Sequence, residues 1–184
     1  FIDPARRSDA NQKVFLWSDC EPNIIDLRPT LQEKASQVLI KASPMLDISS
    51  GSEGLSNLDT IHIISVKNEC KEVLYWLTNG GSETSIKTIN YGGSEADVFR
   101  FAANEEANAN ISYKKPQRYL YEPNTSILKA GAFKLISHKL GVHKLHQNSH
   151  LYTSETLVKN FPGRIFSINH VVKYSKKEVL RHLP

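Results

Sequence analysis

The chain has 184 residues, of which 40% are hydrophobic, so it is long and apolar enough to bury a core and is not intrinsically disordered. It contains no apolar run near the roughly 20 residues that a membrane-spanning helix needs. Its two cysteines, Cys20 and Cys70, have neither metal-site nor redox spacing, which favours a soluble protein of the reducing cytoplasm.

The N-terminal part begins within an expected strand, without the residues that would start it. Residues 1–3 look like the end of a buried strand that Pro4 terminates, and no initiator Met or capping residue precedes them. We therefore expect a fragment of a longer protein. The apolar spacing in residues 23–35 predicts a helix with a start or kink at Pro29, and residues 37–41 predict a central strand.

The next segments continue an alternation of strands and helices. Residues 61–66 predict a strand, and Asn68 is expected to cap a helix that runs to about Leu77, because Glu69 and Glu72 suit its positive N-terminal end. This order is typical of the second half of a wound α/β sheet with parallel strands. Residues 85–91 and 97–102 look like a strand pair, and the polar stretch 103–115 is the expected domain boundary.

The C-terminal part predicts a small α+β module. A strand at 119–121 is followed by a helix from about Thr125 to Leu140, which Gly141 ends. Strands are expected at 142–146, 150–153 and 164–172, and Ser175 can cap a last helix. This β-α-β-β order resembles half of a ferredoxin-like fold.

Charge divides the chain unevenly. Residues 1–90 hold 9 basic and 12 acidic side chains, whereas residues 91–184 hold 14 basic and 7 acidic ones. A polyanion such as RNA is the natural partner of the second half, although a basic surface that only aids solubility explains the excess equally well. The side chains expected to contact RNA are Lys134, His138, Lys144, His146, Tyr152 and Arg164.

Four histidines in this half raise the question of zinc. The spacings of His138, His143, His146 and His150 match no common zinc finger, and neither a cysteine nor a pair of carboxylates completes a site. We therefore expect no metal site.

The motif Asp3-Pro4-Ala5-Arg6-Arg7 follows the first strand directly, where open α/β sheets bind their ligands. It resembles the Asp-Pro-Pro type of catalytic loop that ends the fourth strand of class I S-adenosylmethionine-dependent methyltransferases acting on RNA and DNA bases. Here Ala5 replaces the second proline, and Arg6 takes the place of a stacking aromatic. The alternative is a strand ended by proline, whose arginines pair with local carboxylates. The resemblance implies that Asp3, Pro4, Arg6 and Arg7 belong to the acceptor site. Because successive strands of a parallel sheet end at the same edge, Ser43 and Pro44 are expected to form its opposite wall.

A wider set of motifs is similar to uncharacterised bacterial methyltransferase-like proteins that carry a ferredoxin-like module followed by a THUMP-like domain. The motifs are 2–7 (Ile-Asp-Pro-Ala-Arg-Arg), 41–47 (Lys-Ala-Ser-Pro-Met-Leu-Asp), 68–72, 119–123 and 161–164. The resemblance implies a fold class of α/β, with the second half of a Rossmann-like methyltransferase sheet in residues 1–105. A basic ferredoxin-like module would follow in 106–172, and the start of a truncated THUMP-like domain in 173–184.

The same resemblance implies S-adenosylmethionine as the cofactor of the whole protein and structured RNA, such as tRNA, as its partner. The family's glycine-rich cofactor loop would lie before Phe1, so this chain is expected to lack the main binding loop. Two hypotheses remain open. Either the chain is a fragment of an RNA methyltransferase, or it belongs to a catalytically inactive methyltransferase-like protein that binds RNA.

Overall fold

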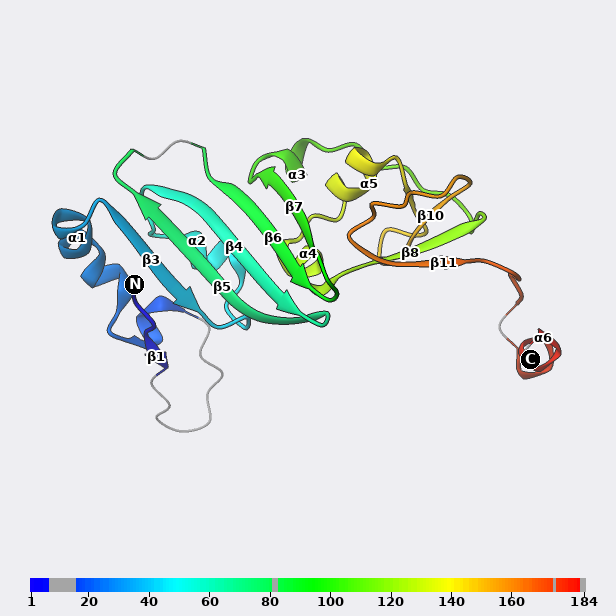
Figure 1. Ribbon diagram of the computed structural model, residues 1–184, viewed down its shortest axis with the longest axis horizontal. Coiled ribbons are helices and arrows are strands. Elements are labelled where there is room, and N and C mark those ends of the chain that lie inside the picture. Colours follow the sequence, from blue (N-terminus) through cyan, green and yellow to red (C-terminus); the bar gives the residue numbers. More distant parts are fainter. Residues whose placement is uncertain (7–15, 81–82, 174, 183–184) are drawn as a thin grey trace. The chain divides into compact units, whose positions relative to one another are not determined.

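The computed structural model describes residues 1–6, 16–80, 83–173 and 175–182 (Figure 1). The chain forms two compact units. Unit 1 consists of Phe1–Asn108 together with Asn124–Ala132, and unit 2 of Ala109–Pro123 together with Phe133–Pro184. The expected α/β class is confirmed by the sheets and helices. Within the described part of the chain, no helix has both the length and the apolar character that crossing a bilayer requires.

Unit 1 is built on a five-stranded sheet, whose strands follow the order β3-β5-β4-β6-β7. These strands are β3 (Gln37–Ala42), β5 (Glu69–Thr78), β4 (Leu58–Val66), β6 (Ser85–Tyr91) and β7 (Ala96–Ala102). β4 and β6 run parallel, and the other three neighbouring pairs are antiparallel. Ile2 forms a further parallel bridge with Ile40. Among the described pairings within residues 1–105, the expectation of parallel strands therefore holds for these two pairs.

The segment 69–77 is a strand and not the helix expected from its first residues. Lys67 and Asn68 both have positive φ, 50° and 61°, and Val66 pairs with Glu69 across them. A two-residue turn of this kind joins antiparallel strands, and Asn adopts it readily. The alternating burial of Val73, Tyr75 and Leu77 is the pattern of a strand with one covered face.

Asn68 does cap a helix, but a distant one. Its Oδ1 accepts a hydrogen bond of 2.8 Å from the backbone N–H of Thr125, the first residue of α4 (Thr125–Ala130). Asn124 adds a second cap by accepting from the N–H of Ile127. α4 packs against β4, β5 and β6, so the tip of the β4–β5 hairpin and this helix stabilise each other.

The remaining elements of unit 1 are short, apart from α1 (Ile24–Lys34). The predicted helix at 23–35 is confirmed as α1, which Asn23 caps and which contains Pro29. α2 (Ile48–Ser52), like α4, lies on one face of the sheet (Figure 1). The other elements are η1 (Trp17–Asp19), α3 (Glu105–Asn108) and the strand pair β1 (Ala5–Arg6) and β2 (Cys20–Glu21).

Unit 2 contains a four-stranded sheet of order β11-β8-β10-β9, whose neighbours are all antiparallel. Its strands are β8 (Tyr119–Pro123), β9 (His143–Lys144), β10 (Tyr152–Ser154) and β11 (Gly163–Ser167). The packing of Tyr121 and Tyr152 around Phe161 forms part of its core, with ring centroids 4.9 and 6.2 Å apart. All four expected strands are present here: β8 extends beyond the expected 119–121, and the other three are shorter than expected.

The single helix expected between Thr125 and Leu140 is two helices. Gly131, with a φ of 71°, ends α4 in the left-handed conformation, and a second helix, α5 (Leu135–Leu140), starts beyond it. Gly141 ends α5 as predicted, with a φ of 66°. The last helix, α6 (Lys176–His182), is capped by Ser175 as predicted, because the N–H of Glu178 donates to its Oγ.

Candidate functional site

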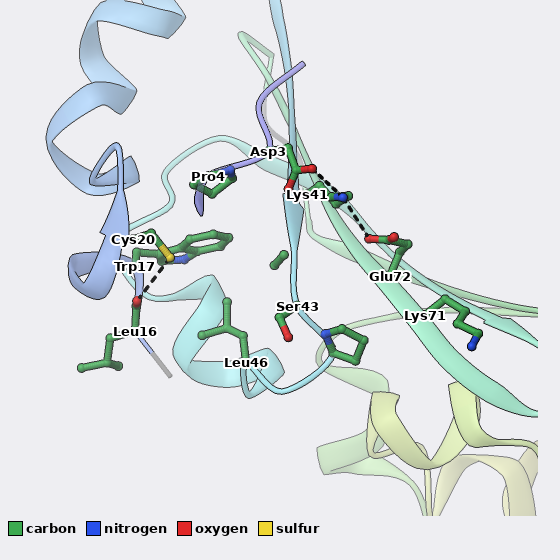
Figure 2. A pocket seen from close by; sticks show the side chains of 12 residues that line it. Asp3, Pro4, Leu16, Trp17, Cys20, Lys41, Ser43, Leu46, Lys71 and Glu72 are labelled. Carbon is green, nitrogen blue, oxygen red and sulfur yellow. Dashed lines mark hydrogen bonds and ion pairs between the residues drawn. The ribbon is translucent and has the colours of Figure 1, made fainter. Parts of the chain in front are cut away.

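A pocket of about 280 Å³ lies in unit 1 where the N-terminal segment passes the end of β3. We call it the Asp3 pocket. Asp3 and Pro4 line it together with Ser43 and Pro44, so the structure brings four of the six expected site residues together. The side chain of Arg6 and the whole of Arg7 lie outside the described part of the chain. The other lining residues are Leu16, Trp17, Cys20, Lys41, Ala42, Leu46, Lys71 and Glu72 (Figure 2).

Backbone pairing determines which residues meet at this pocket. The N–H of Ile2 donates to the carbonyl of Leu39 at 2.9 Å, and the N–H of Lys41 donates to the carbonyl of Ile2 at 2.8 Å. Because Ile2 lies opposite Ile40, the next residues along each segment, Asp3 and Lys41, become neighbours on the same side. Two loops far apart in sequence are thus held at one edge of the sheet.

Lys41 is the cation of the pocket that pairs with Asp3. Its Nζ lies 2.5 Å from Oδ2 of Asp3 and 3.9 Å from Oε2 of Glu72, and Figure 2 shows it between the two carboxylates. The hydrogen bond to Asp3 raises the pKa of Lys41 above its usual value, as do the charges of Glu72 and Asp3, although burial opposes the shift. Lys41 therefore remains a cation, and it forms an ion pair with Asp3.

Sequence reasoning missed Lys41 as a partner of Asp3. It placed the residue within strand 37–41 and looked for cations in the same motif as Asp3, at Arg6 and Arg7. The available signal was positional, because parallel neighbours that end together bring their last residues side by side.

An aromatic wall completes the pocket. The Trp17 side chain is 4% exposed, and its Nε1 donates to the carbonyl of Gly51 at 2.8 Å. Its ring meets the ring of Tyr75 edge to face at a centroid distance of 5.3 Å. Burial and the nearby charge of Asp47 raise the pKa of Tyr75, so its hydroxyl stays neutral. Trp17 follows a segment outside the described residues, and no local pattern marked it as part of a site.

Cysteine chemistry has little support at this pocket. Cys20 is half-buried and is not in a disulfide, and its Sγ lies 3.7 Å from the carbonyl of Leu16. Cys70 is not in a disulfide either, and burial raises the pKa of its thiol, an effect that Lys129 opposes. A raised pKa keeps the Cys70 thiol protonated, which makes it a poor nucleophile. No group of three or more potential metal ligands occurs within the described residues.

The six side chains expected to contact RNA differ in their exposure in unit 2. His138 and His146 are exposed, and Lys134 is half-exposed at the start of α5. Arg164 is 62% exposed, but it pairs with Glu122 on the neighbouring strand at 2.5 Å. These four side chains reach the surface of the unit.

Tyr152 and Lys144 are buried, which corrects the expectation that they contact RNA. Tyr152 has no exposed surface, and its hydroxyl donates to the carbonyl of Phe133 at 2.7 Å. Lys144 is 4% exposed, and its Nζ donates to the carbonyl of Gln147 at 2.9 Å. Lys144 also lies over the Phe133 ring, at 5.6 Å from its centroid. Both side chains are part of the packing of the unit, and the polar group of each donates to a backbone carbonyl.

The described residues do not fit S-adenosylmethionine as a cofactor. Gly80 follows β5, and Gly92 and Gly93 lie between the antiparallel strands β6 and β7, so none of them connects a strand to a helix. A Cβ added to Gly80 or Gly93 would meet no atom within 4 Å, which shows that neither glycine lines a tight cradle. The described residues therefore provide no glycine-rich loop to hold the amino-acid part of such a cofactor.

Comparison with known proteins supports the fold of both units. A family model described as a ferredoxin-like domain matches residues 119–162. No curated protein sequence matches the chain. A solved structure from Porphyromonas gingivalis W83, described as a "putative methyltransferase", is 36% identical and has a TM-score of 0.88. The match covers 97% of this chain and 45% of that chain, so the fold extends over nearly all of these residues but less than half of the relative's length.

Proposed function

We propose that this chain is part of an S-adenosylmethionine-dependent RNA methyltransferase and that the Asp3 pocket is the acceptor side of its active site. The observation that carries the proposal is the meeting of Asp3-Pro4 and Ser43-Pro44 in one pocket, at the end of two parallel segments. Open α/β sheets bind ligands at this position. The shared fold with a protein described as a putative methyltransferase supports the same conclusion.

The pocket suits one base better than a larger ligand. Its volume of about 280 Å³ is at the lower limit of the roughly 300–1,000 Å³ of pockets for drug-sized molecules. Trp17 and the two prolines provide apolar walls, and the Asp3 carboxylate can accept a hydrogen bond from an N–H group of the base. Proline restricts the motion of both loops, which helps to hold the acceptor atom in line with a methyl group.

In this proposal the methyl donor is held by a part of the protein other than the described residues. Residues 1–105 form the methyltransferase part, 106–172 the ferredoxin-like module and 173–184 the start of a THUMP-like domain, with 124–132 packed in unit 1. Unit 2 binds structured RNA, such as tRNA, through its exposed basic side chains. The protein then acts in the cytoplasm.

Replacement of Asp3 tests the acceptor site directly. In the full-length protein, Asp3→Ala should lower methyl transfer to RNA by about 100-fold or more, because the group that orients the base is lost. Affinity for RNA should stay within about twofold, since unit 2 supplies the phosphate contacts. Transfer of a radiolabelled methyl group and filter binding measure the two quantities.

A matched control is Glu33→Gln, an exposed carboxylate on α1 outside the pocket, which should leave both quantities unchanged. If Asp3→Ala retains full methyl transfer, the assignment of the Asp3 pocket is wrong.

One observation favours the second candidate, an inactive methyltransferase-like protein that binds RNA. Ala5, at the position of the loop's second proline, pairs with Glu21 in the strand pair β1–β2, so the segment after Pro4 is extended. An extended segment is less suited than a proline-stiffened loop to orient a base. RNA binding by the wild-type protein without any methyl transfer would identify this candidate.

A further inference from the structure

We propose that Lys41 is a positioning residue of the Asp3 pocket: it holds one carboxylate oxygen of Asp3 and thereby presents the other to the exocyclic amino group of an acceptor base. The inference deepens the proposed function and rests on it. It assigns a role to Lys41, which the motif 41–47 contains but for which the sequence predicted no function.

The backbone places Lys41 so that this contact forms without long-range adjustment. Hydrogen bonds link the N–H of Ile2 to Leu39 and the N–H of Lys41 to Ile2, at 2.9 and 2.8 Å. Ile40, between Leu39 and Lys41 in β3, is fully buried. Its burial fixes the strand, and because side chains alternate along a strand, Lys41 points to the opposite face. The ammonium group therefore approaches Asp3 from a strand that is itself held in the core.

The ion pair leaves half of the carboxylate available. Lys41 contacts Oδ2 of Asp3, and among the described residues it is the ionic partner of this carboxylate. The side chain of Asp3 is 50% exposed and lines the pocket, so Oδ1 can accept a hydrogen bond from a bound molecule. A carboxylate offers about four acceptor positions, and a charge-assisted bond at one of them restricts rotation of the group.

Glu72 provides a second carboxylate near the Lys41 ammonium group. Its Oε2 lies 3.9 Å from the same ammonium group, so Lys41 is drawn toward β5 as well as toward Asp3. Two carboxylates keep the lysine charged, in agreement with its raised pKa. The ammonium group is thus held between two elements, and Asp3 is anchored to the sheet through it.

Ligand pairs that differ by one amino group test the inference on this chain. Trp17 reports binding through its fluorescence in a Trp76→Phe background, and adenosine, cytidine and guanosine are each compared with the same nucleoside without its exocyclic amino group. The wild-type pocket should bind at least one amino nucleoside about tenfold more tightly than its matched analogue. Lys41→Met should reduce this preference to about one, and Lys41→Arg should restore part of it.

Lys87→Met is the control, because Lys87 lies on the same face of the sheet, on β6, and outside the pocket. It should keep the full preference. The urea midpoint of Lys41→Met should stay near that of the wild type, since a partly exposed ion pair contributes little to stability.

The outcomes separate the two proposals. If the wild type shows the preference and Lys41→Met retains it, the role of Lys41 is disproved while the acceptor pocket stands. If the wild type prefers none of the three amino nucleosides, the acceptor assignment itself fails, and the role of Lys41 fails with it. If Lys41→Met loses the preference and Lys41→Arg regains some of it, the positioning role is supported.

Discussion

At the scale of single residues, Gly51 leaves no room for a side chain. A Cβ at this position would overlap the Tyr75 hydroxyl and lie 2.7 Å from its Cζ and 3.0 Å from Cδ2 of Leu46. Tyr75 is fully buried and cannot move aside, and the Gly51 carbonyl also accepts the Trp17 indole N–H. We expect Gly51→Ala to destabilise the protein by about 1–3 kcal/mol, measured by urea unfolding.

Tyr75→Phe provides the test of this explanation. The Tyr75 hydroxyl is buried and has no hydrogen-bond partner among the described residues, so its removal should not itself destabilise. In the double variant Gly51→Ala/Tyr75→Phe, the overlap of the new Cβ with the Tyr75 hydroxyl is removed. The free energy of unfolding should therefore fall less than in Gly51→Ala alone, with a coupling energy of at least about 0.5 kcal/mol. Additive effects would show that the two groups do not meet.

His62 gives the stability a dependence on pH. It lies on β4 with its ring 5.9 Å from the Trp76 ring, and burial lowers its pKa below 6.5, as do the charges of Lys87 and Arg100, against the effect of Asp59. The unfolded chain therefore binds the proton more readily. The stability that His62 contributes is present above pH 6.5 and is lost as the pH falls through the lower pKa of the folded state.

In the variant His62→Gln, the free energy of unfolding should fall less steeply than in the wild type between pH 6.5 and about pH 5. Urea unfolding at several pH values measures the slope, and NMR titration of the His62 ring gives its pKa. A measured pKa at or above the usual value would contradict the prediction.

At the scale of elements, the turn between β4 and β5 determines whether unit 1 has its central hairpin. Lys67 and Asn68 both occupy the left-handed region, which is unfavourable for Lys and tolerated by Asn. Lys67→Gly should therefore stabilise the protein by about 0.5–1 kcal/mol. Asn68→Gly should instead destabilise it by about 1 kcal/mol, because the N–H of Thr125 loses its acceptor.

Urea unfolding of the two variants distinguishes these effects, since both introduce glycine into the same turn. The free energy of unfolding should rise in Lys67→Gly and fall in Asn68→Gly. If both variants change the stability in the same direction, the cap from Asn68 to α4 is not a significant contribution.

At the scale of the whole molecule, the basic excess of unit 2 predicts RNA binding that weakens with salt. Lys114 and Lys115 are exposed ahead of β8, whereas Lys144 is buried and Arg164 is paired with Glu122. Replacing Lys114 and Lys115 together with Ala should reduce the slope of log K against log salt concentration by about one to two. Filter binding at several salt concentrations measures it.

Lys34→Ala on α1 is the control, because Lys34 is an exposed lysine of unit 1 that should not contact RNA. An unchanged slope in the Lys114/Lys115 variant would remove these two residues from the interface.

The parts of the fold that local rules dictate could be predicted from the sequence alone. The apolar spacing of α1, the β-branched runs of β3 and β4, and the stop at Gly141 each depend on a few neighbouring residues. The α/β class followed from the order of these elements. Asp3-Pro4 was expected to follow a buried strand, but the structure has only an isolated bridge at Ile2, and Phe1 is exposed. Asp3 and Pro4 nevertheless line a pocket.

The tertiary structure alone decided which distant residues meet. β5 forms because pairing with β3 and β4 on both sides outweighs the helical signals of Glu69 and Glu72, and sheet pairing is non-local. Lys41 and Asp3 are neighbours through a backbone bridge, and Tyr152 and Lys144 are buried by the packing around Phe133. Charge and aromatic character can be predicted from sequence, but exposure depends on the surrounding elements, which a local pattern does not contain.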